Sequence, residues 1–308
     1  RRLKKGEDLS FFLEADSEEL FEGANMIRDA LCGNKVDLCS IINGRSGRCS
    51  ENCKFCAQSS HHKTGVNEYE FLDPDIIVED CKKHQENGVH RYSIVTSGRT
   101  LSDKDFDKAI AAYKKMSAEC EIELCASHGL LTKDQLIRLK EAGVSMYHAN
   151  IETSKRYFPN ICTTHTYEDK INEIKLAKEA GLKVCSGGII GMGETWEDRI
   201  DMAISLAELE IESIPINALI PIENTCYENL KPLSEDEILR TISIFRYINP
   251  TAYIRMAAGR CYFKDGGKKV FLSGANATIT GDLLTTVGSN IAQDLEMLTS
   301  LGFDLSVI

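Results

Sequence analysis

Hydrophobic and polar positions along the chain follow two different periods. Apolar residues recur every three or four positions in segments such as 133–142, 167–180 and 197–209, which predicts amphipathic helices. The segments between the helices predict eight strands, near residues 38–43, 90–95, 121–126, 145–151, 183–190, 212–218, 252–257 and 275–280. Strands and helices therefore alternate, which is typical of an α/β protein.

Three junctions between a predicted helix and the next strand share one design. Gly88, Gly143 and Gly181 each follow a helical segment, and glycine readily adopts the left-handed conformation that ends a helix. Eight strand-helix units predict a closed (β/α)8 barrel of the TIM type, with an open doubly wound sheet as the alternative. We expect one domain over residues 1–308, with a helical extension over about residues 1–37 before the barrel.

Side chains at alternate positions of the predicted strands divide into an apolar and a polar set. The apolar set should pack on the helices and comprises Tyr92, Ile94, Ile122, Leu124, Ile214, Ile216, Ile254 and Met256. The polar set should point into the barrel and comprises Cys39, Arg91, Ser93, Glu123, Cys125, His148, Asn150, Glu152, Cys185, Ser213, Asn217 and Arg255. Unpaired buried polar groups are costly, so this set predicts a hollow barrel around a ligand. The alternative is structural ion pairs, such as Arg255 with Glu123 or Glu152.

Charge and cysteine content narrow the functional classes. The net charge of −11 has no basic run beyond Arg1, Arg2, Lys4 and Lys5, so nucleic acid is an unexpected partner. No stretch has the length of apolar sequence that a membrane span needs, and we expect a cytoplasmic protein. In a reducing compartment, the 12 cysteines would be free thiols, metal ligands or catalytic groups.

Three cysteines follow the first predicted strand at a spacing of Cys-x3-Cys-x2-Cys. Cys49, Cys53 and Cys56 would lie at the carboxyl end of a barrel strand, where barrels place their active sites. With 12 cysteines in 308 residues, this spacing is expected by chance only about 0.02 times.

Three thiolates on a short loop can hold three irons of a 4Fe-4S cluster and leave the fourth iron open. An open iron can bind the amino and carboxylate groups of S-adenosylmethionine, and an electron from the cluster can then break its C–S bond. The alternative is zinc bound by the triplet together with His61 or His62.

At these cysteines, and at Phe55 before the third one, the sequence resembles the radical S-adenosylmethionine superfamily. Further segments resemble the biotin synthase family within it, in order and at matching intervals. They are TTHTY at 163–167, KVCSGG at 183–188, GMGET at 191–195, SIPIN at 213–217 and LLTT at 283–286. The resemblance extends from about residue 38 to residue 305.

The resemblance implies a (β/α)8 barrel that inserts sulfur into dethiobiotin, using a deoxyadenosyl radical and an auxiliary cluster as sulfur donor. It implies that the triplet binds the radical-generating cluster, and that S-adenosylmethionine is contacted by Phe55, Asn150, Glu152, His165, Gly187, Ile189 and Gly191. The residues it implies for dethiobiotin are His148, Asn150, Asn217, Thr285 and Thr286. His148 stands where the family tends to have asparagine, and His165 where some members have arginine.

The auxiliary cluster is where the sequence departs from the family. The positions that hold it in the commoner pattern are Ser93, Cys125, Cys185 and Arg255 here, and a serine hydroxyl is a poor iron ligand. We hypothesise that Cys39 replaces the missing thiolate, with Arg255 nearby or ligating, in a 2Fe-2S-like cluster or a larger variant. Alternatively, Cys39 is a small buried hydrophobe and the auxiliary cluster is lost. Cys261 is a lesser candidate ligand.

Two other classes of function remain open from the sequence. One is another small-molecule enzyme of the superfamily, such as a hydrogenase-maturation enzyme or an amino-acid mutase, without sulfur insertion. The other is a non-catalytic iron-sulfur or zinc sensor. The family resemblance also implies a homodimer and a flavodoxin or ferredoxin as reductant.

Overall fold

A computed structural model describes residue 3 and residues 5–284 and 288–306. Its strands are β1 (Asp37–Arg45), β2 (Arg91–Thr96), β3 (Glu123–Ser127), β4 (Val144–His148), β5 (Lys183–Cys185), β6 (Gly188–Ile190), β7 (Ser213–Ala218), β8 (Tyr253–Met256) and β9 (Ala277–Ile279). Its α-helices are α1 (Phe11–Glu14), α2 (Ser17–Cys32), α3 (Pro74–Glu86), α4 (Asp103–Glu119), α5 (Lys133–Glu141), α6 (Tyr167–Glu179), α7 (Trp196–Glu208), α8 (Glu235–Ile248), α9 (Lys268–Leu272) and α10 (Ile291–Ser300).

All strand pairs of the sheet are parallel, and the sheet closes on itself. The strand order is β5-β4-β3-β2-β1-β9-β8-β7-β6, and β5 also pairs with β7. β5 and β6 pair with β7 in one continuous register, Cys185 opposite Ser213 and Gly188 opposite Ile216, so together they fill one barrel position. The predicted closed (β/α)8 barrel is therefore confirmed, and the open sheet is excluded.

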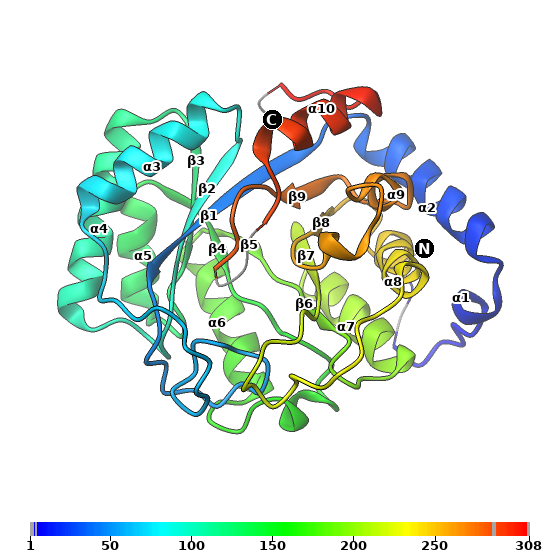
Figure 1. The fold of residues 1–308 in the computed structure, drawn as a ribbon, viewed down its shortest axis with the longest axis horizontal. Helices are drawn as coiled ribbons and strands as arrows, with labels where there is room; N and C mark the ends of the chain where they lie inside the picture. Colours follow the sequence, from blue (N-terminus) through cyan, green and yellow to red (C-terminus); the bar gives the residue numbers. More distant parts are fainter. Residues whose placement is uncertain (1–2, 4, 285–287, 307–308) are drawn as a thin grey trace.

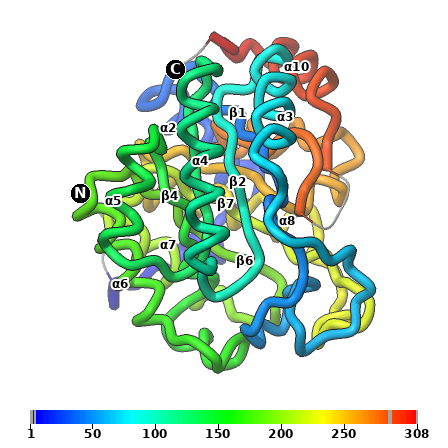
Figure 2. Tube along the Cα trace, turned by 90° about the vertical axis from the view of Figure 1, so that its left-hand side faces the viewer, coloured from blue at the N-terminus to red at the C-terminus, as the bar shows by residue number. Residues whose placement is uncertain are grey.

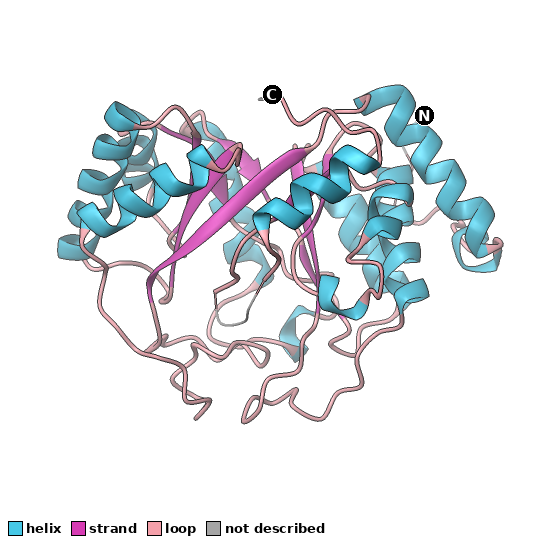
Figure 3. Ribbon diagram, turned by 45° about the horizontal axis from the view of Figure 1, so that its top comes forward, coloured by secondary structure: helices cyan, strands magenta, loops and turns pink. Residues whose placement is uncertain are grey.

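The helices surround the strands as an outer layer. Figure 1 shows α3, α4 and α5 on one side of the barrel and α2, α8 and α9 on the other. Figure 2 shows α4 and α5 covering the strands from a second direction, and Figure 3 shows long loops gathered at one end of the barrel. Among the helices of the described residues, none combines the length and apolar character that a membrane span requires.

Local sequence signals account for where the helices begin and end. Capping boxes start α5, α6, α7 and α8, in which a threonine or serine exchanges hydrogen bonds with the third helical residue. Gly143 and Gly181, which follow α5 and α6, have φ values of 100° and 77°, as the sequence predicts for a left-handed helix end. The predicted helices 133–142, 167–180 and 197–209 match α5, α6 and α7 to within about one residue.

The apolar face of the strands forms the core between barrel and helices. Tyr92, Ile94, Ile214, Ile254 and Met256 are all fully or almost fully buried in one continuous hydrophobic cluster. The predicted outward set is therefore confirmed, which leaves the opposite face of each strand for the interior of the barrel.

Candidate active site

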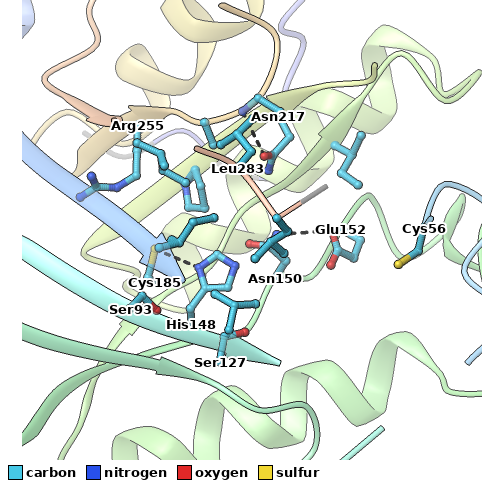
Figure 4. A pocket seen from close by; sticks show the side chains of 18 of the residues that line it. Cys56, Ser93, Ser127, His148, Asn150, Glu152, Cys185, Asn217, Arg255 and Leu283 are labelled. Carbon is cyan, nitrogen blue, oxygen red and sulfur yellow. Dashed lines mark hydrogen bonds between the residues drawn. The ribbon is translucent and has the colours of Figure 1, made fainter. Parts of the chain in front are cut away.

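The barrel encloses a cavity of about 380 Å³, lined by most of the predicted inward set. Figure 4 shows Cys185, Ser93 and Arg255 on one side of it and Cys56 on the other, with Asn150 and Glu152 between them. Cys39, Arg91, Cys125, His148 and Asn217 also line it. The predicted hollow barrel is confirmed. Two members of the set do not line the cavity: Glu123 lies exposed at the start of β3, and Ser213 is buried behind Cys185, whose thiol donates to its hydroxyl at 3.4 Å.

The loop after β1 carries the cysteine triplet and is held closed by its own backbone. Cys49 N–H donates to the Gln58 carbonyl at 3.0 Å, and Cys49 accepts from Ser60 N–H at 2.8 Å. Phe55 and Cys56 line the cavity from this loop. Burial raises the pKa of the Cys56 thiol to about 11, so a metal is needed to stabilise its thiolate.

His61 and His62 engage backbone carbonyls beside this loop. His61 Nε2 lies 3.1 Å from the Ser50 carbonyl oxygen, and His62 Nδ1 lies 2.9 Å from that of Cys56. Neither imidazole has an interaction with a triplet thiol among those found in the described residues, which gives no support to a zinc site of the triplet with either histidine.

The segment after β4 forms the wall nearest the cysteine loop. β4 ends at His148, so the predicted strand 145–151 is too long, and Asn150 and Glu152 lie in the loop that follows. Asn150 Oδ1 accepts a hydrogen bond from Gly187 N–H at 3.0 Å, and Ile189 N–H donates to the Glu152 carbonyl at 2.8 Å. These bonds replace regular strand pairing and split the predicted strand 183–190 into β5 and β6.

Close backbone packing explains the glycine at the split. A Cβ on Gly187 would lie 1.9 Å from the Pro215 carbonyl oxygen, so only glycine fits. Ile189, two residues on, lines the cavity, whereas Gly191 does not and donates its N–H to Glu194 Oε1 at 2.8 Å.

Two charged groups meet at this wall, and the sequence analysis missed one of them. Glu152 has φ of 68°, a strained value for a residue with a side chain, and burial raises its pKa. Lys170 of α6 also lines the cavity, with its ammonium 3.0 Å from Glu173 Oε2. Glu152 and Glu173 help to raise the pKa of Lys170 against the opposing effect of burial. Lys170 belongs to a helix of the outer layer, and its long side chain brings its charge to the cavity.

Polar side chains deeper in the cavity retain free hydrogen-bonding capacity. His148 Nδ1 lies 3.4 Å from the Cys185 sulfur, and burial lowers the pKa of His148 to about 4, so its ring is neutral at neutral pH. The Asn217 amide donates to the Gly188 carbonyl and accepts from Ala258 N–H, each at 3.2 Å, which leaves one N–H and one lone pair. Thr285 and Thr286 lie outside the described residues; the preceding Leu283 and Leu284 line the cavity.

Three further thiols converge on the floor of the cavity. Cys39, Cys125 and Cys185 are buried, and burial raises the pKa of each, that of Cys39 to about 12. Ser93 lies opposite Cys125 in the β2–β3 register, and its buried hydroxyl has no hydrogen-bond partner among the described residues. Unpartnered buried polar groups are rare, and this one fits a cavity that is occupied in the working protein.

Below these thiols, one carboxylate joins two arginines. Asp37 Oδ2 accepts from Arg255 Nη2 at 2.5 Å and from Arg91 Nε at 2.8 Å. Burial would favour the neutral acid, but Arg255 and Arg91 hold the pKa of Asp37 below its usual value. The expected structural ion pairs are therefore present, but the partner of Arg255 is Asp37, and the named pairs of Arg255 with Glu123 or Glu152 are wrong. Asp37 was missed, although it shares the inward parity of Cys39 in β1.

Most of the remaining cysteines lie away from the cavity. Cys81 lies on the buried face of α3, where it packs in the core, and Cys261 is exposed and does not line the cavity. Cys162 differs, because its sulfur lies 3.7 Å from that of Cys53 and 3.3 Å from His165 Nδ1. A hydrogen bond from Cys53, together with His165, lowers the pKa of Cys162 to about 3. No motif in the sequence signals this contact, which spans 109 positions.

Comparison with known proteins agrees with this geometry. The family model of the radical SAM superfamily matches residues 45–206, and that of the biotin and thiamin synthesis associated domain matches residues 215–304. Biotin synthases from Clostridium beijerinckii and Alkaliphilus metalliredigens are each 69% identical over 305 residues, which is 99% of this chain and 96% of theirs. This chain belongs to the biotin synthase family. The resemblance seen in the sequence is therefore confirmed, and the chain is a radical S-adenosylmethionine enzyme.

Solved structures share the fold at much lower identity. A methylornithine synthase has a TM-score of 0.83 at 20% identity, covering 96% of this chain and 92% of its own. An FeFe-hydrogenase maturase from Carboxydothermus hydrogenoformans has a TM-score of 0.82 at 17% identity, covering 96% and 74%. Identity this low shows the fold alone. The two family models together span a single closed sheet. The segment matched by the first contains or overlaps β1–β6, and the segment matched by the second contains or overlaps β7–β9.

Proposed function

We propose that the chain inserts sulfur between two carbons of dethiobiotin to give biotin, with S-adenosylmethionine as the source of the radical. One observation carries this proposal beyond family membership. Figure 4 shows Cys56 of the triplet at one end of the cavity and Cys185 at the other, and the buried thiols Cys39 and Cys125 line the same cavity within electrostatic range of Cys185. A substrate between them would meet a radical source on one side and a sulfur source on the other.

The residues of the cysteine loop fit a 4Fe-4S cluster, since three thiols lie on one short closed loop whose spacing matches such a site. Held by Cys49, Cys53 and Cys56, the cluster would supply the electron that cleaves S-adenosylmethionine. Phe55 and Ile189 would offer apolar surface to the nucleoside, and both line the cavity.

Charged groups of the adjoining wall would orient S-adenosylmethionine. Glu152 is suited to accept hydrogen bonds from ribose hydroxyls, and Asn150 Nδ2 lies 3.4 Å from its carboxylate. Lys170 brings a buried positive charge to the same wall, where a carboxylate of the cofactor could pair with it. His165 and Gly191 remain predicted contacts.

The ureido ring of dethiobiotin needs both donors and acceptors. Asn150 and Asn217 each keep an unused amide N–H or lone pair on the cavity side, and His148 adds a neutral imidazole. Leu283 and Leu284 would close the cavity over the apolar chain of the substrate and exclude water from the radical. The assignment of the substrate carboxylate to Thr285 and Thr286 stays a prediction.

The auxiliary cluster is best held by Cys39, Cys125 and Cys185. All three are buried thiols that line one cavity, whereas Ser93 offers a hydroxyl with no partner. Both terminal nitrogens of Arg255 donate to oxygen atoms, those of Asp37 and Thr278, and the pKa of Arg255 is raised against the opposing effect of burial. We therefore assign Arg255 as a cationic neighbour of the cluster rather than as a ligand.

Product formation tests the proposal. Reconstituted protein is incubated anaerobically with S-adenosylmethionine, dithionite and dethiobiotin, and biotin is measured by mass spectrometry. The Cys125→Ser variant should still cleave S-adenosylmethionine but form no biotin. Cys120→Ser is the matched control, since Cys120 caps α4 outside the barrel, and it should retain both activities. Absence of biotin from the unaltered protein, together with turnover of another substrate, would favour a different member of the superfamily.

Iron and sulfide content tests the role of Cys39 separately. The Cys39→Ala variant should lose the iron and sulfide of the auxiliary cluster and keep those of the triplet. Unchanged content would mean that Cys39 is only a packing residue. A flavodoxin or ferredoxin reductant, a homodimer and a cytoplasmic location stay predictions, as does the auxiliary cluster's nuclearity.

A further inference from the structure

The segment that follows the short 3-10 helix at Phe158–Asn160 packs directly on the cysteine loop. Lys54 N–H donates to the Ile161 carbonyl at 2.9 Å, and Asn52 Oδ1 accepts from the backbone of Thr163 at 2.9 Å and Thr164 at 3.2 Å. These bonds tie together two loops that lie over 100 residues apart in the sequence. Cys162, between the tied positions, is thereby fixed beside Cys53.

Three potential metal ligands meet at this junction. The sulfur of Cys53, the sulfur of Cys162 and Nδ1 of His165 all lie within 4.8 Å of one another. Cys162 is buried, and the side chains of His165 and of the adjacent Glu51 are only 11% and 9% exposed. The site is therefore shielded from bulk water, which favours metal binding by soft donors.

The distances match the edges of a tetrahedral metal site. With Zn–S bonds of about 2.3 Å and Zn–N bonds of about 2.0–2.1 Å, a tetrahedron has S···S edges of about 3.8 Å and S···N edges of about 3.5 Å. The observed separations are 3.7 Å between the two sulfurs and 3.3 Å between Cys162 and His165. Small side-chain shifts would therefore bring all three donors onto one ion.

A carboxylate lies beside these three donors, outside the group that meets within 4.8 Å. Glu51 Oε2 lies 2.6 Å from His165 Nδ1 and accepts hydrogen bonds from Thr164 Oγ1 at 2.8 Å and Arg99 Nη1 at 3.3 Å. An ion on Nδ1 would displace the proton that this short contact shares and would attract the carboxylate. Hydrogen-bonded carboxylates of this kind commonly orient or complete metal sites.

We propose that, in the cluster-free chain, Cys53, Cys162 and His165 bind one thiophilic divalent cation, zinc or ferrous iron, and that the fourth ligand is water or the Glu51 carboxylate after it moves away from Nδ1. The site shares Cys53 with the proposed radical cluster, so the two occupancies exclude each other. Zinc held here would block cluster loading. That the cation and the cluster exclude each other rests on the proposed function, in which Cys53 binds the cluster. Binding of the cation itself does not depend on that proposal.

Cobalt(II) binding separates this site from the triplet. The background is full-length, cluster-free protein with Cys39→Ala, Cys125→Ser and Cys185→Ser, which removes the three deep thiols as competing ligands. Thiolate-to-cobalt absorption is followed on titration. Cys162→Ser and His165→Gln should each lose the tightly bound equivalent, whereas Cys49→Ala, which breaks the triplet alone, should keep it. Far-ultraviolet circular dichroism checks that each variant is folded, and uptake of iron and sulfide by Cys162→Ser checks that its triplet is intact.

Zinc competition provides the second measurement. One equivalent of zinc added before iron and sulfide should lower cluster loading of the background protein and leave that of its Cys162→Ser variant unchanged. The proposal is overturned if Cys49→Ala loses the cobalt while Cys162→Ser retains it, because the metal then sits on the triplet. It is equally overturned if none of the proteins gives thiolate-to-cobalt absorption. If the unaltered protein forms no biotin while the background protein still binds cobalt as described, the result counts against the proposed function alone.

Discussion

Replacing Asp37 by asparagine isolates the carboxylate that joins the two arginines at the floor of the barrel. The Asp37→Asn change keeps the size of the side chain and removes its charge. Asp37 is fully buried, and the side chains of Arg255 and Arg91 are only 4% and 8% exposed. Two guanidinium charges would remain near each other, and their nearest buried counter-charge would be gone.

The expected cost follows from this burial. Breaking a buried ion pair by removing one partner typically costs about 3–5 kcal/mol, because the remaining charge stays desolvated. With an unfolding entropy of about 2.1 cal/mol/K per residue, 308 residues give a fall in melting temperature of roughly 5–8 °C. Since the pKa of Asp37 is held low by the arginines despite burial, the effect should shrink when the pH falls low enough to protonate the wild-type carboxyl.

Thermal unfolding of the cluster-free protein, followed by circular dichroism near pH 7, measures the effect. The matched control is Glu123→Gln, which also removes a carboxylate facing Arg91, at 3.7 Å, but from a side chain that is 49% exposed. Exposed pairs contribute about 0–1 kcal/mol, so this control should melt within roughly 2 °C of the unaltered protein. If Asp37→Asn melts no lower than the control, the reasoning about buried charge at the barrel floor is wrong.

Further predictions concern the cofactor wall and the outer helices. In Gly187→Ala, the added Cβ would lie 1.9 Å from the Pro215 carbonyl oxygen. The free energy of unfolding measured by urea titration should therefore fall by about 1–3 kcal/mol, and an unchanged unfolding midpoint would contradict the packing argument. In Glu152→Ala, loss of the proposed ribose acceptor should weaken S-adenosylmethionine binding by about 1.5–3 kcal/mol in calorimetry of the cluster-loaded protein, whereas equal affinity would remove Glu152 from the binding site. On α3, burial opposes protonation of His84, but its hydrogen bonds to Asp80 outweigh burial, so the pKa of His84 is higher in the folded than in the unfolded protein. The protonated imidazole therefore stabilises the fold at a pH below the unfolded pKa, and this stabilisation is lost as the pH rises through the folded pKa. The His84→Gln change should therefore cost up to about 1 kcal/mol near pH 6 and less near pH 8, and a pH-independent cost would refute this linkage.

The sequence by itself determined the barrel, the inward face of its strands and the cysteine loop. These features depend on patterns within short segments. Side chains alternate between the two faces of a strand with a period of two, and the glycine that ends a helix is determined by the backbone conformation at that one position. Cys39 could therefore be assigned to the interior from its position in β1, and the cavity that it lines bears this out. The triplet was equally visible, since all its ligands lie within eight consecutive residues.

Only the tertiary structure decided which distant side chains meet. Asp37 could have been assigned to the interior, but its contact with both Arg91 and Arg255 depends on strand stagger and barrel closure, which parity does not contain. Lys170 reaches the cavity from a helix, and Cys162 reaches Cys53 because Asn52 and Lys54 bind the backbone of a loop far along the chain. Such contacts arise when separate segments pack against each other, and no periodic signal within either segment records them.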